Sequence, residues 1–378
     1  MKQAKIGDII KISKGKKADL IIEERIDDCH RFIQIDDLRN NNNIKYTNSK
    51  GVKVNPGDVI IAWDGANAGT VGYGLSGIIG STLAKLEILT KEIFPNYLGY
   101  FLKSNFKYLR DQCTGATIPH ISKQTLTELQ IPIPTFEDQK YLVKTLDQAE
   151  SLIQKRKQVI NLINDYIDSV FYEMFVRNPG NHNVHLTKLE NLSLKITDGV
   201  HAKPKYTEEG IPFISVKNIT TTKLKFDDCK FISLADHQKF TKICKSEIGD
   251  ILYTKVGATY GRACVVDTKK DFSLYVSVAL IKPDKSLIEP EFLKAVLNSS
   301  FVKRQADKSV KGAGVPDLHL IEIKKFIIPL PTMQEQKKFS LLVTDIELIK
   351  QKMFVQLDEL ENNFQSLIQK AFKGELAN

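Results

Sequence analysis

The sequence predicts an α+β protein in which two similar globular domains are separated by two long antiparallel coiled-coil helices, as a pseudo-two-fold tandem repeat. Three observations predict this fold class. The chain has 378 residues, which exceeds one ordinary core and suits about two domains of roughly 100–200 residues each. Segments of the first half recur in the second half at a nearly constant spacing. Each half also ends in a long heptad pattern of apolar residues.

The clearest recurrence is a proline-containing strand that leads into a helix. Ile131–Pro134 returns as Ile328–Pro331 at an offset of 197 residues, with the pattern Ile-Pro-x-Pro-x-x-x-x-Gln in both halves. The same offset carries Gly115–Pro119 onto Gly312–Pro316. Further upstream the matching segments lie 192 and then 181 residues apart. Insertions therefore fall in the globular halves, as expected if loops distinguish one half from the other.

These patterns predict the domain organisation. Proline just before each heptad run is a helix start signal, and Arg177-Asn178-Pro179-Gly180 ends the first helix. The predicted segments are a globular domain at residues 1–136, a helix at 137–177, a linker at 178–183, a second globular domain at 184–332, and a second helix with a C-terminal tail at 333–378.

Each globular segment mixes strand and helix patterns. Runs rich in isoleucine and valine between glycine and asparagine turns predict strands at residues 58–62, 82–88, 250–253 and 276–281. A helical pattern at residues 97–111 matches another at 291–305. We therefore predict an α+β domain in each half.

Each heptad run predicts a helix with one apolar seam. The seam of the first helix contains Leu142, Leu146, Ile153, Ile160, Ile163 and Ile167, and that of the second contains Phe339, Val343, Ile346, Met353, Leu357, Leu360 and Phe364. Only Arg156 and Lys350 interrupt these seams. Because each helix follows a similar domain and the chain must return past its start, we expect antiparallel pairing. The alternative is two helices that lie separately on the domain surfaces.

Charge and cysteine content bound the partners and the compartment. The chain carries a net charge of +9, with +4 on residues 1–136 and +7 on residues 184–332, whereas both helical segments are slightly acidic. Basicity on the globular parts favours a polyanionic partner. The five cysteines form no Cys-x-x-Cys pair, which predicts free thiols and a cytoplasmic protein. We expect no membrane partner, because no apolar stretch reaches about 18 residues.

Catalytic motifs are missing from the sequence. No two prolines are adjacent, which excludes the Asp/Asn-Pro-Pro-aromatic loop of amino-methyltransferases, and no phosphate-binding loop of the Gly-Lys-Ser/Thr type is present. Asp317 and Glu322 echo a nuclease metal site, but their spacing leaves little room for the two strands that usually bring such carboxylates together. His182 and His185 have no third zinc ligand at suitable spacing. We expect no catalytic residue and no metal.

Glycine-rich turns and basic segments are the candidates for contacts with a polyanion. Glycine lets backbone N–H groups approach a phosphate, lysine and arginine add charge, and asparagine can read adenine edges. The alternative for each residue is an ordinary hairpin turn or solvated surface. The candidates are Lys14, Lys16, Lys17, Asn41, Asn67, Thr197, His201, Lys203, Lys205, Lys255, Thr259 and Arg262.

The sequence resembles a known family, the specificity (S) subunit of type I restriction-modification systems. The resemblance covers almost the whole chain and is carried by Gly249-Asp250, by the loop Lys255–Arg262 and by the two Ile-Pro-x-Pro segments. Asp198-Gly199-Val200-His201 is similar to the family's Asp-Gly-x-His opening of a recognition domain. The first half departs from this opening and reads Ser13-Lys14-Gly15-Lys16.

The resemblance implies a DNA-recognition subunit without catalytic activity. Each globular domain would read one half of a split, asymmetric target on double-stranded DNA, and the helices would fix the spacer and dock partners. Two modification subunits would bind S-adenosylmethionine and methylate adenine N6. Two restriction subunits would use ATP and Mg²⁺, and this chain itself would bind no cofactor. The alternative is a DNA-binding or scaffold protein outside restriction-modification.

Overall fold

A computed structural model describes residues 2–40, 43–115, 117–177, 184–202, 204–312 and 314–376. Its contacts divide the chain into two compact units, Met1–Lys157 with Val355–Asn378 (unit 1) and Gln158–Phe354 (unit 2). These units differ from the predicted segments because each long helix gives one part to each unit. The predicted linker at 178–183 lies outside the described residues. No helix in the described ranges is long and apolar enough to cross a membrane.

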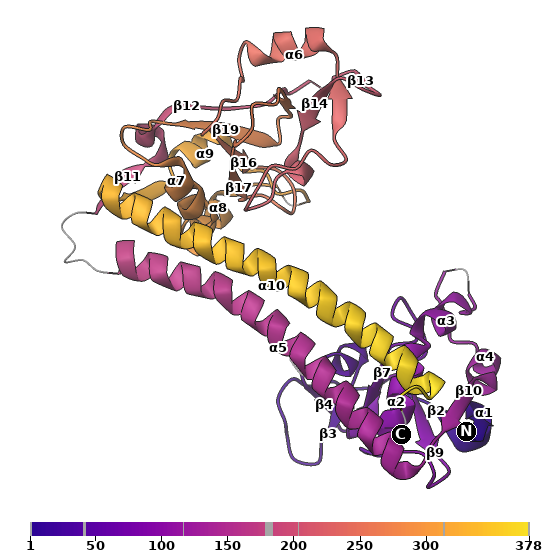
Figure 1. Ribbon diagram of the computed structural model, residues 1–378. Helices are drawn as coiled ribbons and strands as arrows, with labels where there is room; N and C mark the ends of the chain where they lie inside the picture. The colour runs from indigo at the N-terminus through magenta and orange to yellow at the C-terminus, as the bar shows by residue number, and fades with distance from the viewer. Residues whose placement is uncertain are drawn as a thin grey trace. The chain divides into compact units, whose positions relative to one another are not determined.

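Unit 1 contains a globular α+β domain (Figure 1). Its elements are β1 (Lys2–Lys5), α1 (Ile6–Ile9), β2 (Ile10–Lys14), β3 (His30–Ile33), the 3-10 helix η1 (Ile35–Leu38), β4 (Lys45–Thr47), β5 (Val52–Val54), β6 (Val59–Ala62), β7 (Val71–Tyr73), β8 (Gly77–Ile79), β9 (Leu83–Ile88), α2 (Pro95–Ser104), α3 (Phe106–Asp111), α4 (Lys123–Glu128) and β10 (Gln130–Ile133).

Among the described residues of unit 1, the strands form two four-stranded sheets and one two-stranded sheet. Their orders are β2-β9-β6-β7, β4-β3-β8-β5 and β1-β10. Successive side chains of a strand point to opposite faces, so β6 contributes side chains to two hydrophobic cores. Val59 and Ile61 join the larger core, whereas Ile60 and Ala62 join a smaller one. This explains why all four residues of β6 are buried.

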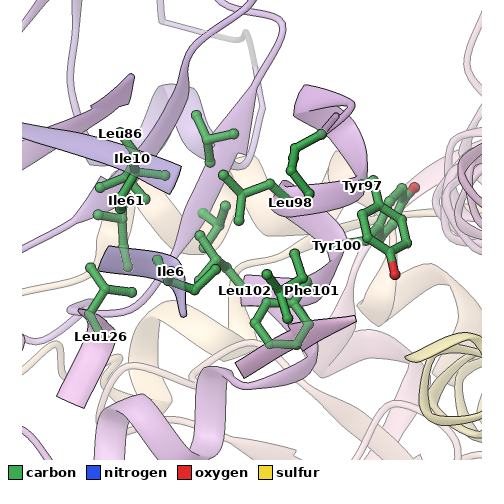
Figure 2. Close-up of a cluster of buried hydrophobic side chains, with 14 of the residues drawn as sticks. Ile6, Ile10, Ile61, Leu86, Tyr97, Leu98, Tyr100, Phe101, Leu102 and Leu126 are labelled. Carbon is green, nitrogen blue, oxygen red and sulfur yellow. The ribbon is translucent and has the colours of Figure 1, made fainter. Parts of the chain in front are cut away.

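The larger core of unit 1 lies between the first sheet and α2 (Figure 2). Leu98 and Leu102 of α2 are fully buried in it together with Ile61 and Leu86 of the sheet. Gly99 allows close packing, because a Cβ atom there would lie 2.2 Å from the ring of Tyr73. The core therefore fixes α2 against the strands whose ends carry the candidate site.

Unit 2 repeats this plan with its own insertions. Its elements are β11 (His185–Lys188), η2 (Leu189–Leu192), β12 (Ser193–Asp198), β13 (Tyr206–Thr207), β14 (Ile211–Ile214), η3 (Val216–Asn218), β15 (Lys230–Ile232), α6 (Leu234–Thr241), β16 (Ile251–Thr254), β17 (Ala263–Val265), β18 (Ser273–Leu274), β19 (Val278–Pro283), α7 (Pro290–Asn298), α8 (Ser300–Ser309), α9 (Leu320–Lys324) and β20 (Ile327–Leu330).

Strand register shows that the two domains are equivalent. The order β12-β19-β16-β17 matches β2-β9-β6-β7, and β11-β20 matches β1-β10. Phe32 pairs in parallel with Ile78, as Phe213 does with Ser273. The second sheets differ at their edges. In unit 2, β13 is an edge strand, and the helix α6 follows β15 along the chain. These insertions account for the changing offset of the sequence repeat.

The predicted strands correspond to β6, β9, β16 and β19, whereas the helix predictions need a correction. Residues 97–111 and 291–305 do not each form one helix, because α2 and α3 break at Asn105 and α7 and α8 break at Ser299. Ser299 has extended backbone angles, and its hydroxyl accepts a hydrogen bond from the N–H of Val302. A serine that caps a new helix in this way stops the preceding one.

The glutamine of each Ile-Pro-x-Pro motif ties the start of a long helix to the globular domain. Gln139 is fully buried, its Oε1 accepts from the N–H of Phe94 at 2.8 Å, and its Nε2 donates to the carbonyl of Glu92 at 2.7 Å. Gln336 makes the equivalent bonds with Glu289 and Leu287 at 2.8 and 3.1 Å. The motif therefore recurs because one buried amide satisfies backbone groups of two segments.

Two long helices, α5 (Phe136–Phe175) and α10 (Met333–Lys373), contribute a helix pair to each unit (Figure 1). In unit 1, Lys157 of α5 forms an ion pair with Glu361 of α10 at 2.7 Å. In unit 2, Asn164 accepts a hydrogen bond from Lys350, and Phe171 packs on Phe339. Residues nearer the end of α5 pair with residues nearer the start of α10, so the two helices are antiparallel.

The seam residues lie along the contact between the helices or against the domain cores. The buried members are Leu142, Leu146, Ile153, Ile160, Phe339, Val343 and Leu357, and the half-buried ones are Ile163, Ile167, Ile346, Met353, Leu360 and Phe364. Both polar interruptions find hydrogen bonds across the pair. Arg156 donates to Gln356 at 2.6 Å, and Lys350 donates to Asn164 at 2.6 Å.

Candidate nucleic-acid interface

A glycine at the end of the first sheet strand marks the same backbone position in both domains. The N–H of Gly15 donates to the carbonyl of Leu83 at 2.8 Å, and that of Gly199 donates to Val278 at 3.2 Å. A Cβ atom would lie 2.2 Å from a carbonyl oxygen at Gly15 and 2.1 Å from one at Gly199. Only glycine fits such an approach. The first domain therefore has a backbone counterpart of the Asp-Gly-x-His segment, although its side chains differ.

The loop that follows the central strand supplies a second matched position. The N–H of Trp63 donates to Thr82 at 2.8 Å, and that of Lys255 donates to Ser277 at 2.9 Å. The carbonyl of Trp63 accepts a hydrogen bond from the N–H of Ile121, and the carbonyl of Lys255 accepts one from the N–H of Leu318. Trp63 and Lys255 are therefore equivalent in backbone, although one is aromatic and the other cationic.

A third segment completes the arrangement. The N–H of Gly65 donates to the carbonyl of Pro119 at 2.9 Å, and that of Gly257 donates to Pro316 at 2.8 Å. The residues after these prolines are His120 in unit 1 and Asp317 in unit 2. We call these three segments the strand-end frame. It comprises residues 13–17, 63–65 and 117–120 in unit 1, and residues 197–201, 255–257 and 314–317 in unit 2.

In unit 1, the side chains of the frame meet at Asp64. The Lys14 ammonium lies 2.7 Å from Asp64 Oδ2, and His120 Nδ1 lies 2.6 Å from Oδ1. Burial alone would raise the pKa of the Asp64 carboxyl, but the hydrogen bonds and charges of Lys14 and His120 lower it below its usual value. The carboxylate is therefore held ionised between two nitrogen groups.

In unit 2, the frame has the opposite arrangement of charge. The buried Lys255 ammonium lies 3.4 Å from Asp198 Oδ2 and 3.8 Å from Asp317 Oδ1. His201 Nε2 lies 3.3 Å from Asp198 Oδ1. Strand register places Asp198 where unit 1 has Lys14, because both pair with an alanine of the neighbouring strand. One cation lies among acidic groups here, whereas one carboxylate lies among nitrogen groups in unit 1.

The glycine-rich turns beside the frame are hairpin turns, as one of the two interpretations expected. They join the antiparallel pairs β6–β7 and β16–β17. Gly65 and Gly257 have positive φ angles of 95° and 84°, and nothing lies within 4 Å of a Cβ atom at either position. Such open glycines leave their backbone accessible to a ligand.

The predicted contact residues differ in exposure. Lys14, Lys16, Lys17, His201, Lys205 and Arg262 are exposed, Asn67, Thr197 and Thr259 are half-buried, and Lys255 is buried, whereas Asn41 and Lys203 lie outside the described residues. Asn67 accepts a hydrogen bond from Arg39 at 2.5 Å, and the carbonyl of Thr259 accepts one from Thr254. Lys255 is therefore placed to hold the frame rather than to reach a phosphate from the surface.

The candidate contact residues did not include four polar residues that the frame brings together, namely Asp64, His120, Asp198 and Asp317. The offset of 197 already paired His120 with Asp317, but a histidine aligned with an aspartate carries no chemical signal by itself. Glu322, which the nuclease comparison joined to Asp317, lies in α9 and pairs with Lys325. Across the described ranges, no three His, Cys, Asp or Glu side chains gather as a metal site would require.

Two copies of one α+β domain, each with the same frame and different side chains, define a duplicated recognition protein. The family described as type I restriction modification DNA specificity domain matches residues 1–164 and 188–353. The chain therefore belongs to the type I restriction-modification DNA specificity family. This membership supports the specificity-subunit interpretation over a scaffold protein outside restriction-modification.

Curated relatives and solved structures agree with this family. The type I restriction enzyme MjaVIII specificity subunit of Methanocaldococcus jannaschii is 26% identical over 96% of this chain and 91% of its own length. The EcoBI specificity subunit of Escherichia coli is 23% identical over 91% and 80%. The solved S subunit of a type I system from M. genitalium has a TM-score of 0.52 at 17% identity and covers 98% of this chain and 96% of its own.

A chain from a structure described as "Structural basis underlying complex assembly and conformational transition of the type I R-M system" has a TM-score of 0.64. It is 16% identical and covers 99% of this chain and 98% of its own length. At these identities, the solved structures show the fold alone.

Proposed function

We propose that this chain gives a type I restriction-modification complex its DNA sequence specificity, with each globular domain reading one half of a bipartite, asymmetric target. The observation that carries this proposal is the strand-end frame, which occurs twice with one backbone and two different sets of side chains. Identical domains would read identical half-sites, whereas different side chains on one backbone suit an asymmetric target. The positive charge of both globular segments supports binding to the DNA backbone.

The long helices fix the spacer between the half-sites and dock two modification subunits. Exposed apolar side chains outside the seam support a docking role, because a partner protein that covered them would remove apolar surface from water. The exposed apolar residues on the two helices are Phe136, Tyr141, Leu152, Val159, Leu162, Tyr166, Leu341, Leu348, Ile349, Phe354 and Val355.

Catalysis belongs to the partner subunits in this proposal. Modification subunits bind S-adenosylmethionine and methylate adenine N6, and restriction subunits use ATP and Mg²⁺ to move and cut DNA. This chain supplies no cofactor site. The missing methyltransferase and nucleotide-binding motifs support this division. The five free thiols support a reducing compartment such as the cytoplasm.

Genome-wide methylation mapping tests the proposed function. A strain that carries this chain and its modification partner should methylate adenine in one split, asymmetric motif, and deletion of this gene alone should remove that methylation. The purified chain alone should neither methylate nor cut DNA. Mg²⁺-dependent cutting by the isolated chain that Asp317→Ala abolishes would contradict the proposal, as would a methylation pattern that does not change upon deletion.

A further inference from the structure

The polar centre of the strand-end frame differs between the domains in the hydrogen-bonding groups it exposes. In unit 1, Lys14 is 52% and His120 45% exposed, whereas the Asp64 side chain between them is 15% exposed. In unit 2, Asp317 is 41% exposed, whereas Lys255 is 8% exposed. Unit 1 therefore exposes nitrogen groups over a carboxylate, and unit 2 exposes a carboxylate over an ammonium group.

The Asp317 side chain is partly exposed, but one of its two carboxylate oxygens is turned inward toward Lys255. Its Oδ1 is buried and has no hydrogen bond from any described residue, and its ion-pair distance to Lys255 is 3.8 Å. Ser277, whose carbonyl anchors Lys255 in the frame, also has a buried hydroxyl without a hydrogen-bond partner among the described residues. Polar groups that only hold loops together are normally satisfied in the free protein.

DNA bases differ in the groups that such a centre can recognise. Guanine presents two acceptors, N7 and O6, in the major groove, which suit lysine and other nitrogen donors. Adenine N6 and cytosine N4 are amino donors, which suit a carboxylate acceptor. An exposed carboxylate is repelled by phosphates, so Asp317 is best accommodated in a DNA interface if it accepts a hydrogen bond from a base.

We propose that the frame centres are specificity-determining sites, at which Lys14 and His120 read the acceptor edge of a guanine in one half-site and Asp317 reads a base amino group in the other. Asp64 and Lys255 are positioning residues, because each lies behind the exposed groups and pairs with them. This inference rests on the proposed function, since it assumes that both domains bind DNA. The backbone is common to both centres, so the difference in side chains sets the difference in bases.

The test uses the complete chain with its modification partner and compares Asp317→Asn and His120→Gln with wild type. Methylation mapping defines the motif, and binding to targets with single-base substitutions measures discrimination at each position. Each variant should lose about 5- to 150-fold discrimination at one position, in the half-site of its own domain only. Glu322→Gln is the matched control, because this nearby acidic residue lies outside the frame and should leave the motif unchanged.

Two results would overturn the inference. One is an unchanged motif and unchanged discrimination in both variants. The other is an equal loss of affinity for every DNA sequence, which would make the centres loop supports or phosphate contacts. If Asp317→Asn fails to fold, the result for His120→Gln decides, because it tests the other centre. If wild type itself methylates no split motif, the proposed function fails. If wild type does but both variants keep its base preferences, only this inference fails.

Discussion

At the scale of the residue, the structure separates two cations that the sequence placed together on one loop. Lys255 and Arg262 both belong to a glycine-rich turn in the more basic domain. Lys255 is buried beside Asp198 and Asp317, whereas Arg262 is exposed. Burial of one of two similar side chains depends on contacts far apart in sequence, which explains why loop composition alone did not distinguish them.

Lys255 and Arg262 should respond differently to substitution. Arg262→Gln should weaken DNA binding about equally for all sequences and reduce the slope of log affinity against log salt by about 1, if the guanidinium contacts a phosphate. Lys255→Met should instead lower the melting temperature, because it leaves Asp198 and Asp317 without their cation. Salt titrations and thermal unfolding distinguish the variants. An unchanged slope and affinity for Arg262→Gln would make this residue ordinary surface.

The repeat predicted which backbone positions correspond, but it could not show which side chains meet. Pro119 and Pro316 were matched by their common offset, and both lie in the frame. Gly15 and Gly199 lie in the segments that were compared as domain openings, but their neighbouring residues differ, so the sequence did not show that the two glycines occupy one backbone position. The equivalence depends on a close approach to a carbonyl oxygen, which becomes visible only when the neighbouring strand is in place.

At the scale of the element, the apolar periodicity predicted the long helices and the main strands, since both depend on local patterns. It did not predict the breaks at Asn105 and Ser299. The apolar pattern continues across both positions. The Asn105 side chain donates to the carbonyl of Phe101 at the end of α2, and the Ser299 hydroxyl accepts from the N–H of Val302 at the start of α8. Polar side chains that bond to the backbone can therefore override an apolar period.

The buried amide of Gln139 should stabilise the junction between α5 and the first domain. Gln139→Met keeps the approximate side-chain volume but leaves the N–H of Phe94 and the carbonyl of Glu92 without their partner. Each unsatisfied buried group costs about 1–3 kcal/mol, so we expect a clear fall in the free energy of unfolding. Gln148→Met, at an exposed position of the same helix, is the control. Equal stability of the two variants would contradict this role.

The seam between the helices should be equally sensitive to charge. Ile160 is 4% exposed, so Ile160→Asp places a carboxylate in an apolar contact without a cation. We expect a lower melting temperature or weaker binding of the modification partner. Asn161→Asp adds the same charge at the next, exposed position and should have little effect. If Ile160→Asp changes neither property, Ile160 does not belong to a packed seam.

At the scale of the whole molecule, duplication accounts for the organisation of the chain. Each unit contains one globular domain and one antiparallel helix pair, and both long helices contribute to both units. The sequence predicted this plan because the repeat and the heptads extend over most of the chain. It did not predict the bases that each domain reads, because the deciding side chains come from three segments that meet only in the folded domain.

The most direct measurement of the central claim is methylation mapping of a variant with one extra heptad in each long helix. One heptad keeps the seam in register and lengthens a helix by about 10 Å, or at most about three base pairs of B-DNA. Each added base pair also rotates the far half-site by about a tenth of a turn, so we expect weaker binding and a spacer longer by about one to three base pairs. The bases of both half-sites should stay the same. Altered half-site bases with an unaltered spacer would contradict the account.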